Sequence, residues 1–347
     1  MNLNNYIYNT FIIIITFITF STFNSCSRDK KDTELFFIQG NVAYQKGDYE
    51  KAVDFYTEAI EKTPTFADAY NNRGTTKLAL EDIHGAIIDF EKAISLDSKF
   101  ILAKYNLADA LSNTDKLDES LELLKTIEST YKDSSFYFVT MSNAFIRKNN
   151  FQEANNALQK AITLDKKNDK AYTNLGFIQY LQKEYNSAKA NFEIAIQLNP
   201  KQDFALNNLS LIYANQNNFI KAIELVDKAL SIKKDVLYEN NKGYYLLNTN
   251  KLEEGRKLID QALQKDKDNA WAVRNIGVYE LLKDNSVKAI EYFIKSEKLD
   301  PTVELVNFYL GLAYNKSGNK QKACDYWKVG QQLNETKSIE KLREVCK

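Results

Sequence analysis

Apolar side chains recur along most of the chain at spacings of three and four residues, which is the period of an α-helix. The segment "AVDFYTEAI", residues 52–60, has apolar residues at positions i, i+3, i+4 and i+7. Short polar segments such as "GDY" at 47–49 and "NNF" at 217–219 interrupt the pattern, and their residue types favour turns. The pattern therefore predicts an all-α fold made of amphipathic helices joined by tight turns.

Small residues divide this helical pattern into periods of 34 residues, with one period of 33. Each period has three such positions, the second twelve residues after the first and the third seven residues after the second, and all of them except Ile127 hold a small residue. Pro64, Pro200 and Pro301 all lie five residues after a third position, where a proline ends a helix. The first small positions are Gly40, Gly74, Ala108, Ser142, Gly176, Ser210, Gly243, Gly277 and Gly311.

This period, with three small positions and a late proline, resembles the tetratricopeptide repeat (TPR). The resemblance covers about residues 33–332 and implies a right-handed superhelical solenoid of about nine helix-turn-helix repeats. We place the solenoid at 34–332. The following segment, 336–347, has an apolar stripe and is otherwise charged, so it is predicted to be the capping helix that the end of a solenoid needs.

The first residues differ from the repeats. The apolar run "FIIIITFITF" at 11–20 is shorter than a membrane-spanning helix and suits the core of a signal peptide. The stretch "FNSC", which ends at Cys26, resembles the lipobox of bacterial lipoproteins. The resemblance implies a signal peptide at 1–25, lipidation of Cys26 and a charged tether at 26–33. With Ser27 after the cysteine, it favours the outer membrane. The alternative is an uncleaved anchor helix, and either interpretation places this end at a membrane.

Two further cysteines, Cys324 and Cys346, lie at equal distances from Glu335, near the turn that we expect before the capping helix. Facing positions of a helical hairpin are equidistant from its turn, so a disulfide between them is predicted. A disulfide fits an exported protein. The alternative is two separate buried thiols.

Composition limits the possible chemistry. Lys and Arg together number 46, equal to Asp and Glu, so the basic excess of a nucleic-acid-binding protein is missing. The one histidine, His84, is expected on the surface, and no metal or phosphate-binding motif is present. Because the repeats occupy nearly the whole chain, we predict no catalytic residues, no metal, no cofactor and no enzyme activity.

The resemblance implies that the first helix of each repeat lines a concave groove. Two residues before the first small position, six of the repeats have an asparagine. A carboxamide has a donor and an acceptor, so a row of them could hold the backbone of an extended peptide. Alternatively, these amides serve only neighbouring helix ends. The asparagines are Asn72, Asn106, Asn174, Asn208, Asn241 and Asn275.

Aromatic side chains and one arginine share the predicted groove, as is common in partner-binding surfaces. They are Phe37, Tyr105, Phe177, Tyr180, Tyr244, Arg274 and Phe308. We therefore expect a membrane-anchored, non-enzymatic scaffold that binds an extended peptide or a partner subunit and serves in the assembly of envelope complexes. A lipoprotein that captures glycans or other solutes is the alternative.

Overall fold

The structure, a computed structural model, describes residues 30–346, and every regular element in this range is an α-helix. The helices pack in consecutive pairs, so the expected all-α TPR-like solenoid is confirmed. The predicted signal peptide and the predicted lipidation site Cys26 lie outside the described residues.

The described chain divides into two compact units, which meet between Asn168 and Asp169. The N-terminal unit begins with a helix whose described residues are 30–46. Its other helices are α2 (Tyr49–Lys62), α3 (Ala67–Ala79), α4 (Ile83–Leu96), α5 (Ile101–Ser112), α6 (Leu117–Tyr131), α7 (Ser135–Arg147) and α8 (Phe151–Leu164).

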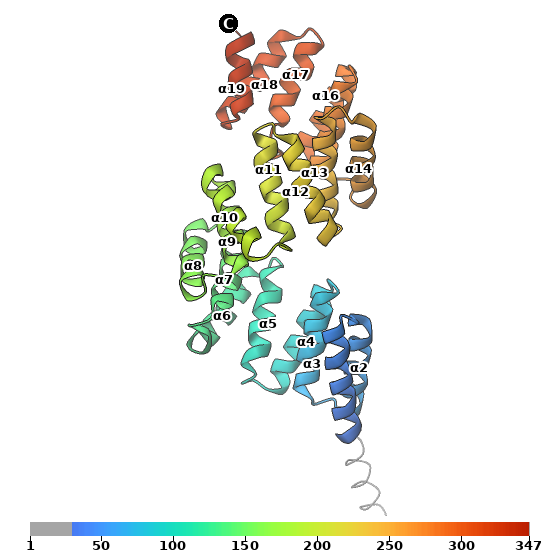
Figure 1. Cartoon of the computed structure of the whole chain (residues 1–347), viewed down its shortest axis with the longest axis vertical. Coiled ribbons are helices and arrows are strands. Elements are labelled where there is room, and N and C mark those ends of the chain that lie inside the picture. The colour runs from blue at the N-terminus through green and yellow to red at the C-terminus, as the bar shows by residue number, and fades with distance from the viewer. Residues whose placement is uncertain (1–29, 347) are drawn as a thin grey trace, which may run out of the picture. The chain divides into compact units, whose positions relative to one another are not determined.

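The C-terminal unit continues the same alternation from Asp169 onward. Its helices are α9 (Asp169–Leu181), α10 (Tyr185–Leu198), α11 (Asp203–Asn215), α12 (Phe219–Ile232), α13 (Val236–Leu247), α14 (Leu252–Lys265), α15 (Ala270–Leu282), α16 (Ser286–Leu299), α17 (Val306–Lys316), α18 (Lys320–Gln332) and α19 (Thr336–Val345). Within each repeat the first helix packs on the second, as α17 packs on α18 (Figure 1).

The turn between the two helices of a repeat has a conserved geometry within this chain. Seven residues after the first small position, eight of the nine repeats have a residue with a φ angle near +60° or +80°. Glycine adopts this left-handed conformation without steric cost, and asparagine tolerates it better than most other residues. The eight residues are Gly47, Glu81, Asn149, Lys183, Asn217, Asn250, Asp284 and Gly318.

The first small position of each repeat faces a buried side chain sixteen residues further along, on the second helix. Where that side chain is aromatic, the small residue is glycine, and a Cβ there would lie within 3.0 Å of the ring, as at Gly74 beside Phe90 and Gly277 beside Phe293. Where the partner is Leu124, the small residue is Ala108. Every aromatic partner therefore faces a glycine, a correspondence that the period alone did not indicate, and Gly243 faces the aliphatic Ile259.

The second small position lies where the two helices cross, and it is fully buried in the repeats with alanine or serine. Ser120 stands where most repeats have alanine, and its hydroxyl donates to the backbone oxygen of Ala108 at 2.7 Å. The polar group is therefore satisfied across the helix pair, and the close approach of the two helices is kept.

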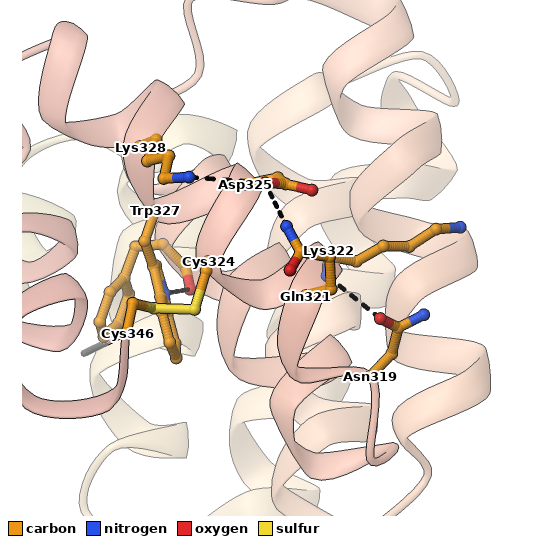
Figure 2. Close-up of a disulfide and its surroundings, with 9 residues drawn as sticks. Asn319, Gln321, Lys322, Cys324, Asp325, Trp327, Lys328 and Cys346 are labelled. Atoms are coloured by element: carbon orange, nitrogen blue, oxygen red, sulfur yellow. Dashed lines mark hydrogen bonds and ion pairs between the residues drawn. A yellow bond between two sulfur atoms is a disulfide. The ribbon is translucent and has the colours of Figure 1, made fainter.

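The end of the chain folds as predicted. In α19, Ser338 is fully buried and Lys337, Glu340, Lys341, Arg343 and Glu344 supply charge. Figure 1 shows α17, α18 and α19 side by side, and Figure 2 shows the disulfide that joins α18 to the residue after α19. The bond links Cys324 to Cys346, whose Cα atoms are 5.8 Å apart, so the predicted pairing is confirmed.

Candidate functional site

Four asparagines of the predicted groove donate to other asparagines in the preceding repeat. In the N-terminal unit the Asn106 amide donates to Asn71 Oδ1 at 2.9 Å, and the Asn72 amide donates to Asn41 Oδ1 at 2.9 Å. Asn71 in turn donates to Asn72 Oδ1 at 3.1 Å. The result is a row of amides across the first three repeats, in which the second and third repeats each donate to the one before.

The C-terminal unit repeats this arrangement in a buried setting. Asn241 donates to Asn207 Oδ1 at 2.9 Å, and Asn275 donates to Asn240 Oδ1 at 3.0 Å. Asn208 donates instead to the backbone oxygen of Phe204, at 2.7 Å.

Three of the acceptors, Asn71, Asn207 and Asn240, lie three residues before the first small position, next to the predicted asparagines, whereas Asn41 directly follows Gly40. Sequence reasoning missed them, although the doublets "NN" at 71–72, 207–208 and 240–241 mark the place. A buried amide needs such a partner, because leaving it unpaired costs about 1–3 kcal/mol. The row therefore joins successive repeats, and its role in binding a partner stays a prediction.

A pocket of about 230 Å³ opens in the inner wall of the N-terminal unit, and it contains one of the predicted residues, Asn72. Its other lining residues come from the first helix, α2 and α3; they are Asn41, Tyr44, Gln45, Tyr56 and Thr75. Sequence reasoning did not single out this set, because the residues come from three helices that only the fold brings together.

Hydrogen bonds at this pocket orient the Asn41 amide. Its oxygen accepts from the Tyr56 hydroxyl at 2.7 Å and from Asn72 Nδ2 at 2.9 Å. Burial raises the pKa of Tyr56 to about 12, so the hydroxyl keeps its proton and remains a donor. Both lone pairs of the Asn41 oxygen are therefore used, and its two N–H groups remain for an acceptor in the pocket.

The two predicted aromatic residues of the N-terminal unit, Phe37 and Tyr105, pack against other rings of that unit. Phe37 lies against Phe66 with ring centroids 4.9 Å apart, and Tyr105 stacks on Tyr131 with centroids 5.0 Å apart. The Tyr105 hydroxyl also shares a hydrogen bond with Thr140, and burial raises its pKa to about 12. These rings support the wall, and both remain partly exposed on it.

Arg274 of the C-terminal unit is buried, with 5% of its surface exposed. Its guanidinium donates to Asn275 Oδ1 and to the backbone oxygen of Glu304, and it lies over the rings of Tyr244 and Trp271. No carboxylate among the described residues forms an ion pair with it. Neutral oxygens and ring faces therefore solvate this charge.

The remaining predicted residues gather around the same inner wall. The hydroxyls of Tyr244 and Tyr309 share a hydrogen bond of 2.7 Å, and Phe308 packs edge-on against Tyr309. Tyr180 is 8% exposed, and the ring of Phe177 contacts Phe204. In this unit the predicted groove residues form internal packing, whereas in the N-terminal unit one of them, Asn72, lines an open pocket.

The part of the chain that the structure describes gives little support for a metal site, a catalytic site or a membrane-spanning helix. His84 is exposed, and among residues 30–346 no three His, Cys, Asp or Glu side chains cluster as metal ligands would. Asp89 is buried, but its carboxylate forms ion pairs with Arg73 and Lys77, each with an N–O distance of 2.7 Å. We interpret Asp89 as part of a structural ion-pair cluster. None of the described helices has the length and apolar character needed to cross a bilayer.

Family comparisons find the repeat directly. A profile described as "TPR repeat" matches residues 40–81 and 143–183. Two profiles described as "Tetratricopeptide repeat" match residues 67–100 and 169–202, and residues 205–237. These matches fall in both compact units.

Relatives of known identity are distant. The mouse "Mitochondrial import receptor subunit TOM70" is 24% identical over 204 residues, which are 56% of this chain and 33% of that protein. The human "Protein O-mannosyl-transferase TMTC3" is 24% identical over 282 residues, which are 76% of this chain and 31% of that protein. The chain thus spans about a third of the length of these two relatives.

The solved structure of the "APC/C hetero-tetramer Cut9-Hcn1" superimposes on this chain with a TM-score of 0.60 at 14% identity, covering 91% of this chain and 76% of that one. The likeness concerns the fold alone. The profile matches, the 34-residue period and the paired helices show that both units of the chain contain tetratricopeptide repeats.

Proposed function

We propose that this TPR protein is a membrane-anchored scaffold that binds an extended segment of a partner protein on the inner wall of its N-terminal unit. TPR proteins serve as protein–protein interaction scaffolds, and the family is typically non-enzymatic. Support for the location comes from the pocket at Asn41, Tyr44, Gln45, Tyr56, Asn72 and Thr75. The inner wall of the C-terminal unit is occupied by its own side chains.

The pocket is suited to a peptide group. The free N–H groups of Asn41 can donate to a carbonyl oxygen, and the exposed Gln45 amide offers both a donor and an acceptor. Tyr44 and Tyr56 supply ring surface, which favours an apolar side chain beside that carbonyl. No charged residue lines the pocket, so an uncharged section of the partner is favoured over an acidic or basic one.

The anchor is supported by sequence alone, through the apolar run at 11–20 and the lipobox-like "FNSC". Lipidation at Cys26 would hold the solenoid at a bilayer, with the outer membrane as the favoured location. In that setting, assembly of envelope complexes is the role that fits best. A fatty-acid analogue incorporated into the native chain and absent from Cys26→Ala would support this part of the proposal.

A photo-crosslinking amino acid tests the groove. Placed at Gln45 it should give discrete adducts with one or a few membrane-associated proteins, whereas the same group at Glu58, an exposed residue of α2, should not. With the captured partner purified, Gln45→Ala combined with Thr75→Ala should weaken binding about tenfold or more, which is 1.4 kcal/mol. Equal adducts at both positions, or unchanged affinity, would rule out this wall as the binding site.

A further inference from the structure

The first helix of the solenoid carries an apolar stripe that no described part of the chain covers. Leu35 is 52% exposed, Ile38 is 57% exposed and Val42 is 43% exposed. Their spacing of three and four residues places them on one face of the helix, away from Gly40 and Ala43, which pack inward. Single exposed apolar residues are ordinary, but three in a row on one helix face form a patch.

The stripe corresponds to the face that each later repeat buries. At the position of Leu35 every later repeat has a side chain that is at most 4% exposed, for example Ala69, Ala103 or Tyr137. At the position of Val42 the later repeats include Ala110, Ala144 and Tyr245, all buried. At the position of Ile38 stand asparagines such as Asn106, which donate to the preceding repeat. The first helix thus presents a stacking face with no repeat before it.

The two ends of the described solenoid differ in how their last helices are covered. At the C-terminal end, α19 covers the last repeat, carries five charged residues and is held by the disulfide. The described N-terminal end has no such cover, and at its stacking positions it has Leu, Ile and Val rather than polar residues. A solenoid end exposed to water is normally polar, so this end is built to meet something apolar.

Two lysines extend the same stripe. Lys31 lies four residues before Leu35 and Lys46 lies four residues after Val42, and both are exposed with no ion pair to a described residue. We propose that this face of the first helix lies in the interface of an anionic lipid bilayer, with Leu35, Ile38 and Val42 inserted and the two lysines at headgroup phosphates.

The location of the stripe in the chain favours a lipid surface as its occupant. The helix follows closely on the apolar run at 11–20 and on Cys26, so the inference rests on the membrane anchoring proposed above. Anchored there, the helix would set the orientation of the solenoid, with its N-terminal end toward the membrane.

Charge argues against a second copy of the chain on this face. In an antiparallel pairing about Ile38, Lys30 of one copy would face Lys46 of the other, and in a parallel pairing each lysine would face itself. Like charges in such positions disfavour association. Stacking onto the far end of another copy would instead place the apolar stripe on the charged helix α19.

Depth measurements on the full chain test the inference. In a Cys26→Ser background, Ile38→Cys is labelled with an environment-sensitive fluorophore, and Ile220→Cys, an isolated exposed residue of α12, is the matched control. In phosphatidylglycerol–phosphatidylethanolamine vesicles, nitroxide lipids should quench the label at 38 about threefold or more strongly than the label at 220. Lys31→Glu with Lys46→Glu should abolish the difference.

The other outcomes are decisive as well. If the chain floats with the vesicles but the label at 38 is quenched no more than the label at 220, another part of the chain makes the contact and the inference is wrong. If the chain does not float, the inference also fails, whereas the lipid anchor, whose cysteine is absent from this background, is judged by the fatty-acid labelling of native Cys26. If the emission at 38 shifts to the blue without vesicles as protein concentration rises, a second copy covers the stripe and the inference is overturned.

Discussion

At the level of single residues, the packing of each repeat depends on a pair of positions sixteen residues apart. Glycine faces Tyr56, Phe90, Phe192, Phe293 and Trp327, whereas alanine or serine faces the smaller Leu124, Leu158 and Val226. The interior is densely packed, so added volume on one helix requires removed volume on the other. Each aromatic side chain therefore faces a glycine, and Gly243, which faces Ile259, is the one first-position glycine with an aliphatic partner.

This pairing predicts a strong coupling between Gly277 and Phe293. In Gly277→Ala the new Cβ would lie 2.5 Å from the Phe293 ring. Overpacking of this kind costs about 1–3 kcal/mol of stability, which exceeds the stability gained from the higher helix propensity of alanine. With Phe293→Leu added, the site resembles the native pair of Ala108 and Leu124. Urea unfolding of the two single variants and the double variant should give a favourable coupling of about 1 kcal/mol or more.

The reverse exchange is the control for that cycle. Ala108→Gly with Leu124→Phe converts an aliphatic repeat to the aromatic type, and the double variant should again lose less stability than the two single variants predict together. If the changes in unfolding free energy are additive in both cycles, the ring and the glycine do not interact energetically.

The candidate site was only partly predictable from residue positions. The period placed Asn72 and Asn106 on the inner wall, because every first helix has the same face inward. It could not show the direction of each amide, which depends on the residue that the preceding repeat offers, such as Asn71 or Asn41. The period likewise gave Arg274 a place in the groove without showing that α17 and its loop bury it.

At the level of elements, the helices were well predicted because their boundaries have local causes. A left-handed residue follows the first helix in eight of the nine repeats. Asp side chains such as Asp97 and Asp165 accept from the backbone N–H two residues on, where the next turn begins. The division between Asn168 and Asp169 was not predicted. Repeats on either side of it have the same spacing, so no sequence signal marks it.

The capping helix α19 is held by more than the disulfide. Glu335 accepts from the backbone N–H of Leu305 at 3.0 Å, and Lys337 donates to Asn217 at 3.0 Å. Figure 2 shows that the Cys324–Cys346 bond lies beside Trp327, the fully buried ring of the last repeat. The cap therefore covers the end of the core, and its detachment would expose that ring.

Removal of the disulfide should loosen this cap first. A loop of this size contributes about 3 kcal/mol in the loop-entropy treatment. Cys346→Ser, or reduction of the native protein, should therefore speed hydrogen exchange in α18 and α19 by up to about a hundredfold, as local opening becomes easier, with the N-terminal unit unchanged. Hydrogen-exchange mass spectrometry measures both regions at once, and Cys26→Ser is the control. Uniform acceleration along the chain would mean that the bond stabilises the whole solenoid.

At the level of the whole molecule, stability comes from many similar interfaces rather than from one core. Each repeat buries its apolar face only against its neighbours, so the ends of the array are its weakest places. One end has α19 and a covalent bond, whereas the first helix leaves Leu35, Ile38 and Val42 exposed. This asymmetry is consistent with a protein whose two ends meet different surroundings.

The buried tyrosines make the fold sensitive to alkaline pH. Burial raises the pKa of Tyr56, Tyr105 and Tyr137 to about 12, and it raises the pKa of Tyr180 and Tyr245 as well. A phenol whose pKa is higher in the folded state than its ordinary 10.0 loses its proton more readily on unfolding. Its contribution is therefore complete below pH 10 and declines as the pH rises through the folded-state value.

We accordingly expect the free energy of unfolding to fall steeply between pH 10 and pH 12, with the absorbance of phenolate rising in step with the loss of helical circular dichroism. Tyr137→Phe removes one such group, fully buried in α7, and should make the fall shallower. Tyr70→Phe, a partly exposed residue of α3, is the control and should leave the slope unchanged. Phenolate absorbance that rises fully before any helix is lost would mean that the rings ionise in the folded protein, and that burial does not protect them.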